Sequence, residues 1–193
     1  SHPRLILGST SRYRPELLQR LPVPFDVASP DVDETPHSAE APRQLALRLA
    51  LAKAHAVAKQ HPSCVVIGSD QVADLAGTPL GKPGDHQRAV QQLQQMRGRT
   101  VVFQTAVAVV HLDAGFEQVD LAPVQVRFRA LSDAAIEHYL RTEQPYDCAG
   151  SAKSEGLGIA LLESIDNDDP TALVGLPLIR TCRMLRAAGI PLL

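Results

Sequence analysis

The first residues that can do chemistry lie close to the start of the chain. An apolar segment at residues 5–7 leads through Gly8 into three hydroxyl residues and two arginines, Ser9-Thr10-Ser11-Arg12-Tyr13-Arg14. Free backbone N–H groups and the helix dipole attract anions to the start of a helix. The hydroxyls can cap such a helix or donate to phosphate, and a guanidinium adds a charged fork. The spacing matches neither a Walker loop nor a dinucleotide fingerprint, so an ordinary capped helix is the alternative.

A second candidate is an acid that follows a buried apolar segment. Residues 64–67 are apolar, and they are followed by Gly68-Ser69-Asp70-Gln71. A carboxylate delivered to the edge of a sheet can bind a divalent metal or accept a proton from water. Aspartate after Gly-Ser is also common in turns, so a plain turn is the alternative for Asp70.

An acidic cluster lies earlier in the chain, in the segment Asp31-Val32-Asp33-Glu34-Thr35. Carboxylates gathered in a loop suit Mg²⁺, which prefers oxygen ligands and keeps several waters. The Asp-x-Asp-x-Thr pattern also resembles the nucleophile motif of haloacid-dehalogenase-type phosphatases. That motif follows a strand directly, and Pro30 argues against a strand here, so the phosphatase interpretation is disfavoured. The remaining alternative is a solvated turn.

Two lysines and one glutamate complete the candidate set. Lys53 lies among alanines and leucines, where a lysine can simply extend to solvent. Lys82 follows Gly81 and precedes Pro83, and a proline-fixed turn preorganises a lysine as a phosphate contact. Glu155 lies in the Gly/Ser-rich segment 151–158, which is either a surface turn or a loop that closes over a ligand. The seven histidines lack zinc-site spacing, which argues against a zinc centre.

The elements that must position these residues alternate between strand and helix patterns, which predicts an α/β fold. Strands are expected at residues 5–7, 25–28, 64–67, 71–75, 100–110 and 119–130. Gly68 is expected to end the strand at 64–67. Helices are expected at residues 13–21, 38–60, 85–96, 132–141 and 176–188. The pattern predicts a mixed central β-sheet flanked by helices, and such sheets bind ligands beyond the carboxyl ends of their strands.

Composition narrows the class of protein. The chain has 193 residues, of which 45% are hydrophobic, and a net charge of −2. These values predict one domain over residues 1–193 with a real core, and they argue against a nucleic-acid-binding surface. Three widely spaced cysteines without a CxxC pair predict reduced thiols in a cytoplasmic protein. We expect no membrane span or secretory signal, and we interpret Ser1-His2 as a cloning remnant.

Together, these segments resemble the Maf family of nucleotide pyrophosphatases. In chain order, the matching segments are residues 5–11 with Arg14, 32–35, 49–50 with 53–54, 67–71, 81–83, 149–151 and 173–178. The ordered set covers nearly the whole chain, so the match is specific although no single segment is. The resemblance implies a mixed sheet flanked by helices, in two lobes with a central cleft.

The resemblance also implies an activity, which is hydrolysis of nucleoside triphosphates between the α- and β-phosphates with a divalent cation (Mg²⁺, Mn²⁺ or Co²⁺). By resemblance, the triphosphate is contacted by Ser9, Arg14, Lys53 and Lys82. Glu34 and Asp70 hold the metal, and Asp70 accepts the proton of the attacking water. Fixed cations then help most as charge develops on the pyrophosphate, while the metal activates the water.

Within the family, the chain resembles the branch that acts on 7-methyl-GTP, through Gln71, segment 153–156 and segment 100–105. Glu155 can accept both the N1–H and the 2-amino group of guanine. Methylation at N7 makes the base cationic, which favours the aromatic face of Tyr13 and a nearby carboxylate. Gln71 can donate to or accept from a base edge. The chain departs from the pattern at Tyr13, usually tryptophan in that branch, and at Arg12, usually proline, which has no assigned role.

Three other functions remain open at this stage. The first is the same reaction on dTTP or UTP, which Glu155 disfavours because a pyrimidine offers only one Watson–Crick donor. The second is a nucleotide-binding regulator of cell division, since the family name derives from inhibited septum formation. The third is a phosphomonoesterase that releases orthophosphate. The expected partner is a small-molecule nucleotide, and a homodimer is a family-level expectation.

Overall fold

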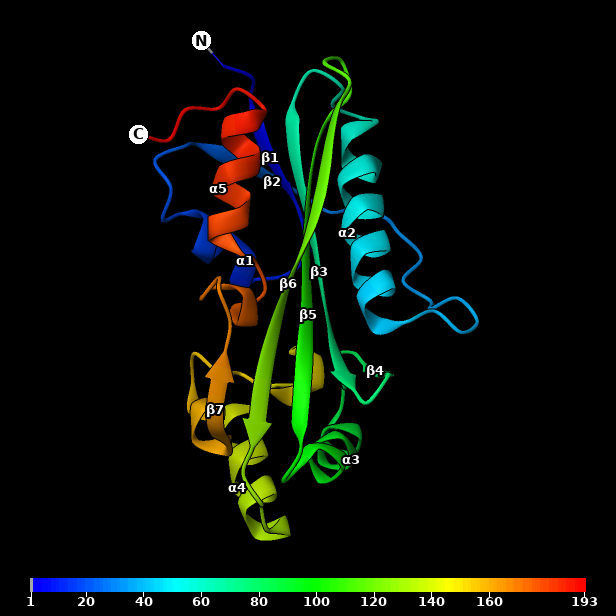
Figure 1. The fold of residues 1–193 in the computed structure, drawn as a ribbon, viewed down its shortest axis with the longest axis vertical. Helices are drawn as coiled ribbons and strands as arrows, with labels where there is room; N and C mark the ends of the chain where they lie inside the picture. Colours follow the sequence, from blue (N-terminus) through cyan, green and yellow to red (C-terminus); the bar gives the residue numbers. More distant parts are fainter. Residues whose placement is uncertain (1) are drawn as a thin grey trace.

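A mixed β-sheet runs the length of the molecule and carries helices on both faces (Figure 1). The computed structural model describes residues 2–193, so Ser1 lies outside the described residues. The strands are β1 (Leu5–Gly8), β2 (Phe25–Ala28), β3 (Val65–Leu75), β4 (Thr78–Leu80), β5 (Thr100–His111), β6 (Phe116–Phe128) and β7 (Leu162–Asp166). The helices are α1 (Tyr13–Leu18), α2 (Pro42–Ala58), α3 (His86–Met96), α4 (Asp133–Glu143) and α5 (Leu178–Ala187).

The strand order confirms the predicted mixed sheet. The order is β2-β1-β3-β5-β6-β7, and the short strand β4 pairs with β3. Strand β1 is parallel to both of its neighbours, whereas all pairs from β3 to β7 are antiparallel. Strands β4 and β7 were missed by the sequence prediction. β4 is three residues long and β7 is mostly exposed, so neither shows a clear apolar alternation.

The core divides the molecule into two lobes that share the long strands β3, β5 and β6 (Figure 1). In the first lobe, Leu5 and Leu7 face the apolar sides of α1 and α5, while Ile6 faces α2 on the other side of the sheet. In the second lobe, α3 and α4 pack around Phe103 and Phe128. The three cysteines are free thiols. Among the described helices, none has the length and apolar character needed to cross a bilayer.

Gly68 does not end a strand, and this prediction was wrong. Strand β3 continues through it to Leu75, and Gly68 pairs with Gly8 of β1. Its missing side chain instead allows α2 to approach. A Cβ at Gly68 would lie 2.3 Å from the carbonyl oxygen of Ala50 and 2.5 Å from the backbone nitrogen of Ala54. This close approach brings the middle of α2 against the residues that follow Gly68 in β3.

Gly68→Ala is therefore expected to destabilise the protein by about 1–3 kcal/mol, because the added methyl forces helix and strand apart. Chemical denaturation monitored by circular dichroism measures this change in the free energy of unfolding. Gly81→Ala is the matched control, because a Cβ there meets no atom within 4 Å. An equal loss in the two variants would contradict the packing explanation.

Candidate active site

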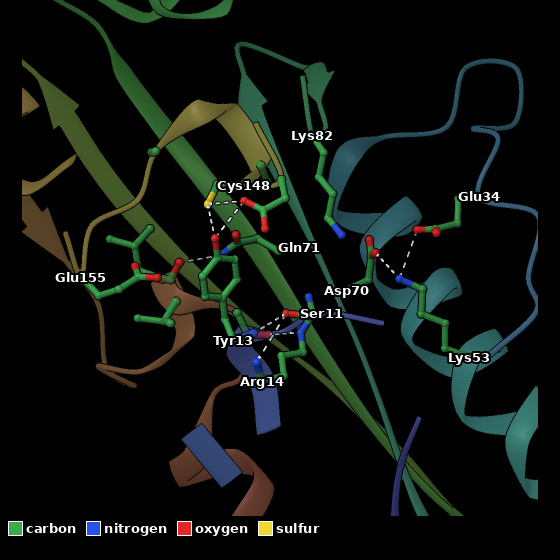
Figure 2. Close-up of a pocket in the computed structure, with 16 residues that line it drawn as sticks. Ser11, Tyr13, Arg14, Glu34, Lys53, Asp70, Gln71, Lys82, Cys148 and Glu155 are labelled. Atoms are coloured by element: carbon green, nitrogen blue, oxygen red, sulfur yellow. Dashed lines mark hydrogen bonds and ion pairs between the residues drawn. The ribbon is translucent and has the colours of Figure 1, made fainter. Parts of the chain in front are cut away.

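An open cleft of about 540 Å³ lies between the lobes, and most of the predicted site residues line it (Figure 2). Eight of the nine predicted residues form part of its wall: Tyr13, Arg14, Glu34, Lys53, Asp70, Gln71, Lys82 and Glu155. Ser9 does not line the cleft. Ser9 is buried between β1 and α1, where its Oγ accepts the backbone N–H of Ser11 at 3.0 Å.

An ion-paired lysine forms the centre of the cleft. Lys53 Nζ lies 2.9 Å from Asp70 Oδ1 and 3.1 Å from Glu34 Oε1 (Figure 2). Lys53 comes from α2 and Asp70 from β3, so the close packing at Gly68 sets their separation. Glu34 comes from the loop before α2, and its side chain is 59% exposed. The lysine thus holds two carboxylates from separate segments on one side of the cleft.

Asp70 has an unusual environment for a carboxylate. It is only 6% exposed, and burial raises its pKa even though Lys53 and Arg14 favour the charged form. Its Oδ2 atom is buried and makes no hydrogen bond within the described chain. Burying a polar oxygen without a partner costs about 1–3 kcal/mol. A ligand that supplies a positive group or a proton to Oδ2 would remove this cost.

The donor set fits a hard divalent cation. Glu34 and Asp70 provide carboxylate oxygens on the same lysine, and Oδ2 of Asp70 lacks a partner. Within residues 2–193, no cluster of three or more acidic, histidine or cysteine side chains has a metal-site arrangement. A cation such as Mg²⁺ commonly uses one or two carboxylates and fills its other positions with water and substrate phosphates. The two carboxylates therefore match that mode of binding.

Two further cations face the same space. Arg14 is 8% exposed, and its Nε donates to the carbonyl oxygen of Gly175 at 2.7 Å. Burial lowers the pKa of Arg14, while Asp70 and Glu34 favour its charged form. The pKa of Lys82 is lowered first by desolvation and then by repulsion from Arg14 and Lys53. Arg14, Lys53 and Lys82 outnumber the two carboxylates beside them, so the cleft favours an anion such as a polyphosphate.

The start of α1 differs from the predicted phosphate cradle. The helix has six residues, so its dipole is short. Ser11 Oγ accepts the backbone N–H groups of Tyr13 at 3.1 Å and of Arg14 at 3.4 Å. The predicted hydroxyl cap is therefore present, but it occupies the amides that were expected to bind an anion. The cationic side chains Arg14, Lys53 and Lys82 line this cleft and supply positive charge to it.

Tyr13 lies at the other end of the cleft and connects the two lobes. Its hydroxyl donates to Asp147 Oδ1 at 2.8 Å and accepts from Arg12 Nη2 at 2.9 Å. Arg12 Nε also pairs with Asp147 Oδ2 at 3.2 Å, which gives Arg12 the role that sequence reasoning did not assign. The ring is flanked by the guanidinium of Arg12 at 5.0 Å and by Lys153 Nζ at 5.7 Å.

Gln71 is oriented by the protein itself. Its Nε2 lies 3.0 Å from Thr105 Oγ1, 3.1 Å from the carbonyl oxygen of Ala172 and 3.0 Å from that of Leu173. The two backbone carbonyls only accept, so they fix which end of the amide carries the nitrogen. Oε1 makes no hydrogen bond within the described chain. Gln71 can therefore present an acceptor, rather than a donor, to a ligand in the cleft.

The loop that carries Glu155 is held by Glu143, the last residue of α4. Glu143 Oε1 pairs with Lys153 Nζ at 3.0 Å, and Oε2 accepts the backbone N–H of Leu157 at 3.1 Å. Both bonds lower the pKa of Glu143, and the bond to Lys153 has the larger effect. A Cβ at Gly156 would lie 2.5 Å from Glu143 Oε1, so a side chain there would force the Glu143 carboxylate to move. Glu143 thus fixes the loop on both sides of Glu155.

Replacing Glu143 with alanine is expected to loosen this loop. Amide hydrogen exchange in residues 153–158 should become faster by about tenfold, because a hydrogen bond to a charged group contributes roughly 1.5–3 kcal/mol. Glu143→Gln keeps an acceptor for the Leu157 amide but loses the ion pair with Lys153, so its effect should be smaller. Exchange that is unchanged in the alanine variant would show that other contacts hold the loop.

Sequence reasoning missed Asp147 and Glu143, which position Tyr13 and Glu155. Neither lies in a motif with chemical spacing, and Asp147 is 134 residues from its partner Tyr13. The unexplained arginine at position 12 is the sequence signal that could have indicated Asp147, its ion-pair partner. Within the acidic segment, Asp33 makes a local bond, in which its Oδ1 accepts the N–H of Thr35 at 3.0 Å, whereas Glu34 reaches the cleft.

Comparison with known proteins agrees with this geometry. The family model described as Maf-like protein matches residues 4–188. The chain is 77% identical to the 7-methyl-GTP pyrophosphatase of Polaromonas sp., over 97% of this chain and 86% of the relative. It is 73% identical to the protein of that name from Albidiferax ferrireducens, over 98% of this chain and 96% of the relative. It is 60% identical to the one from Burkholderia thailandensis, over 100% of this chain and 91% of the relative. The chain therefore belongs to the Maf family.

Proposed function

We propose that this chain is a nucleoside triphosphate pyrophosphatase that hydrolyses 7-methyl-GTP to 7-methyl-GMP and pyrophosphate. The observation that carries the proposal is the pair of carboxylates, Glu34 and Asp70, joined by Lys53 within a cleft that holds two more cations. The names of the similar proteins support the choice of substrate.

Asp70 is the proton acceptor in this proposal. Its Oδ2 atom is buried and has no hydrogen-bond partner among residues 2–193, so it is available to orient a water and take its proton. A divalent cation (Mg²⁺, Mn²⁺ or Co²⁺) held by Glu34 and Asp70 would lower the pKa of a bound water and neutralise phosphate oxygens. Lys53 keeps both carboxylates in place before substrate arrives.

The remaining cations bind the triphosphate. Arg14, Lys53 and Lys82 line the cleft on the side of Asp70, where they can neutralise the charge that develops on pyrophosphate. The buried bond from Arg14 to Gly175 fixes the guanidinium, so its cost of ordering is already met in the folded protein. Ser9 acts from behind the cleft, through its bond to the Ser11 amide.

The base binds at the end formed by Tyr13 and Glu155. Glu155 can accept the N1–H and 2-amino groups of guanine, and Oε1 of Gln71 is a further acceptor. The cationic, N7-methylated ring favours an aromatic face and a carboxylate. Lys153 would repel that ring if it were free, and its ion pair with Glu143 reduces this repulsion.

A substrate screen with the purified protein tests the proposal. Canonical and methylated triphosphates are compared, and both pyrophosphate and orthophosphate are measured. We expect 7-methyl-GTP to give the highest kcat/KM, with pyrophosphate as product. Preference for dTTP or UTP would show that the substrate is a pyrimidine nucleotide. Release of orthophosphate would show that the protein is a phosphomonoesterase. Binding without turnover would indicate a regulator.

Three broader features belong to the same proposal. They are a single Maf-type domain over residues 1–193, a cytoplasmic location and a homodimer. Their support is the family match over most of the chain. A single cooperative unfolding transition is expected for one domain. Sedimentation equilibrium tests the homodimer, and cell fractionation tests the cytoplasmic location.

The base preference should depend on pH through Glu155. Desolvation, and then the carboxylates of Glu143 and Glu16, raise the pKa of Glu155, while Lys153 lowers it. The net raised pKa means that Glu155 loses its charge at a higher pH than an ordinary glutamate. Preference for 7-methyl-GTP over GTP should therefore fall as the pH is lowered and Glu155 becomes protonated. The ratio of kcat/KM values for the two substrates measures this preference. A ratio that stays flat there would contradict a role for the charge.

A further inference from the structure

A largely apolar cavity of about 300 Å³ adjoins the cleft beside Lys82, Asp70 and Glu34, which lie away from Glu155 in Figure 2. The cavity is continuous with the cleft, because both are lined by Glu34, Asp70, Gln71 and Lys82. Its remaining wall is Gly81 and five apolar residues, Pro36, Leu45, Leu49, Val72 and Pro79. These residues come from the loop before α2, from α2 itself and from strands β3 and β4.

A simple triphosphate does not account for this wall. A terminal phosphate carries close to two negative charges at neutral pH and is strongly hydrated. The leucines, valine and prolines offer it no donor, and Glu34 at the rim repels it. A terminal phosphate that is esterified carries one charge fewer. The group esterified to it can then cover the apolar wall.

The direction of the substrate follows from the order of the groups. In the proposed function, the base binds at Tyr13 and Glu155, and the phosphates bind beside Arg14, Lys53 and Lys82, all of which line the cleft. A substituent on the terminal phosphate then extends beyond Lys82, into the apolar cavity. The cavity volume of about 300 Å³ is at the lower end of the range of roughly 300–1,000 Å³ that is typical of small-molecule sites, which is the scale of a single nucleoside.

We propose that the enzyme also cleaves dinucleoside triphosphates, with the 7-methylguanosine end at Tyr13 and the second nucleoside in the apolar cavity. This inference rests on the proposed function. The oxygen of water bonds to the phosphorus next to 7-methylguanosine, and the bond from that phosphorus to the bridging oxygen breaks. The second nucleoside leaves as its diphosphate with the bridging oxygen, and the proton of water passes to Asp70. The products are 7-methyl-GMP and a nucleoside diphosphate.

The test uses the full chain with Mg²⁺ and two substrates, 7-methyl-GTP and 7-methylguanosine joined through a triphosphate to adenosine. We expect 7-methyl-GMP and ADP from the second substrate, with kcat/KM within about tenfold of that for 7-methyl-GTP. Cleavage of 7-methyl-GTP alone would overturn this inference and leave the proposed function intact. Cleavage of neither would overturn both. Release of 7-methyl-GDP and AMP would overturn the assigned direction.

A pair of variants tests where the second nucleoside lies. Pro36 is exposed on the cavity wall, so Pro36→Asp adds a charge there without disturbing the core. We expect it to lower kcat/KM for the dinucleoside substrate by about tenfold more than for 7-methyl-GTP. Pro191→Asp, at an exposed proline near the C-terminus, is the matched control and should leave this ratio unchanged. Equal losses on both substrates in Pro36→Asp would contradict the placement.

Discussion

Asp70→Asn is expected to lower kcat for pyrophosphate release by roughly 10²–10⁴-fold, the range that general-base catalysis contributes. An amide cannot accept the proton of water, and it is a poor ligand for a divalent cation. The change also leaves Lys53 with Glu34 as its single carboxylate partner. The variant should fold, because asparagine keeps the shape of the side chain and avoids burying a charge. Steady-state assays and thermal unfolding together measure both outcomes.

Asp74→Asn provides the matched control, because Asp74 lies on the same strand but outside the cleft. Its Oδ1 accepts the N–H of Gly77 at 2.8 Å, and an amide oxygen can replace that acceptor. We expect kcat of this variant to stay close to wild type. Wild-type turnover by Asp70→Asn would refute the assigned mechanism, and a large loss in both variants would point to a structural cause.

Glu155→Gln is expected to reduce the preference for 7-methyl-GTP by about 10–100-fold, since hydrogen bonds to a charged group contribute roughly 1.5–3 kcal/mol. Glutamine offers one acceptor and a donor, so it cannot accept both guanine donors, and it has no charge to attract the cationic base. The measured quantity is the ratio of kcat/KM values for 7-methyl-GTP and UTP.

Glu163→Gln is the control for this change, because Glu163 pairs with Arg127 on the surface and does not line the cleft. The control should keep the wild-type ratio. An unchanged base preference in Glu155→Gln would revive the pyrimidine triphosphates as substrates. The Glu143 variants then separate the charge of Glu155 from the position of its loop.

Much of the fold was predictable, because burial repeats along the chain with a clear period. Residues 25–28 form β2 as expected, and the predicted strand at 119–130 is β6, which spans Phe116–Phe128 and alternates as an antiparallel strand does. The helix expected at 38–60 is shorter, since α2 begins at Pro42, where a missing N–H costs nothing. The role of Gly68 was not predictable, because the clash that excludes a side chain comes from α2.

The site was predictable where one residue carries its own chemical signal. Asp70 and Glu34 were candidates from their own segments, whereas Lys53 was assigned only through the family resemblance; the three side chains form the ion-paired centre. Positioning residues carry no such signal. The carboxylate of Asp147 matters because folding places it against Tyr13, and the direction of the Gln71 amide depends on carbonyls about 100 residues away. Such partners become visible only when the chain is folded.

The shared sheet has a mechanical consequence for catalysis. Strands β3 and β5 pair without interruption from Val66 to Asp74, and this ladder passes behind the cleft from one lobe into the other. A hinge between rigid bodies would have to break those backbone bonds. The sheet therefore holds the two lobes rigidly relative to each other. We expect substrate binding to depend instead on local rearrangement of Arg12, Lys153 and the exposed loops.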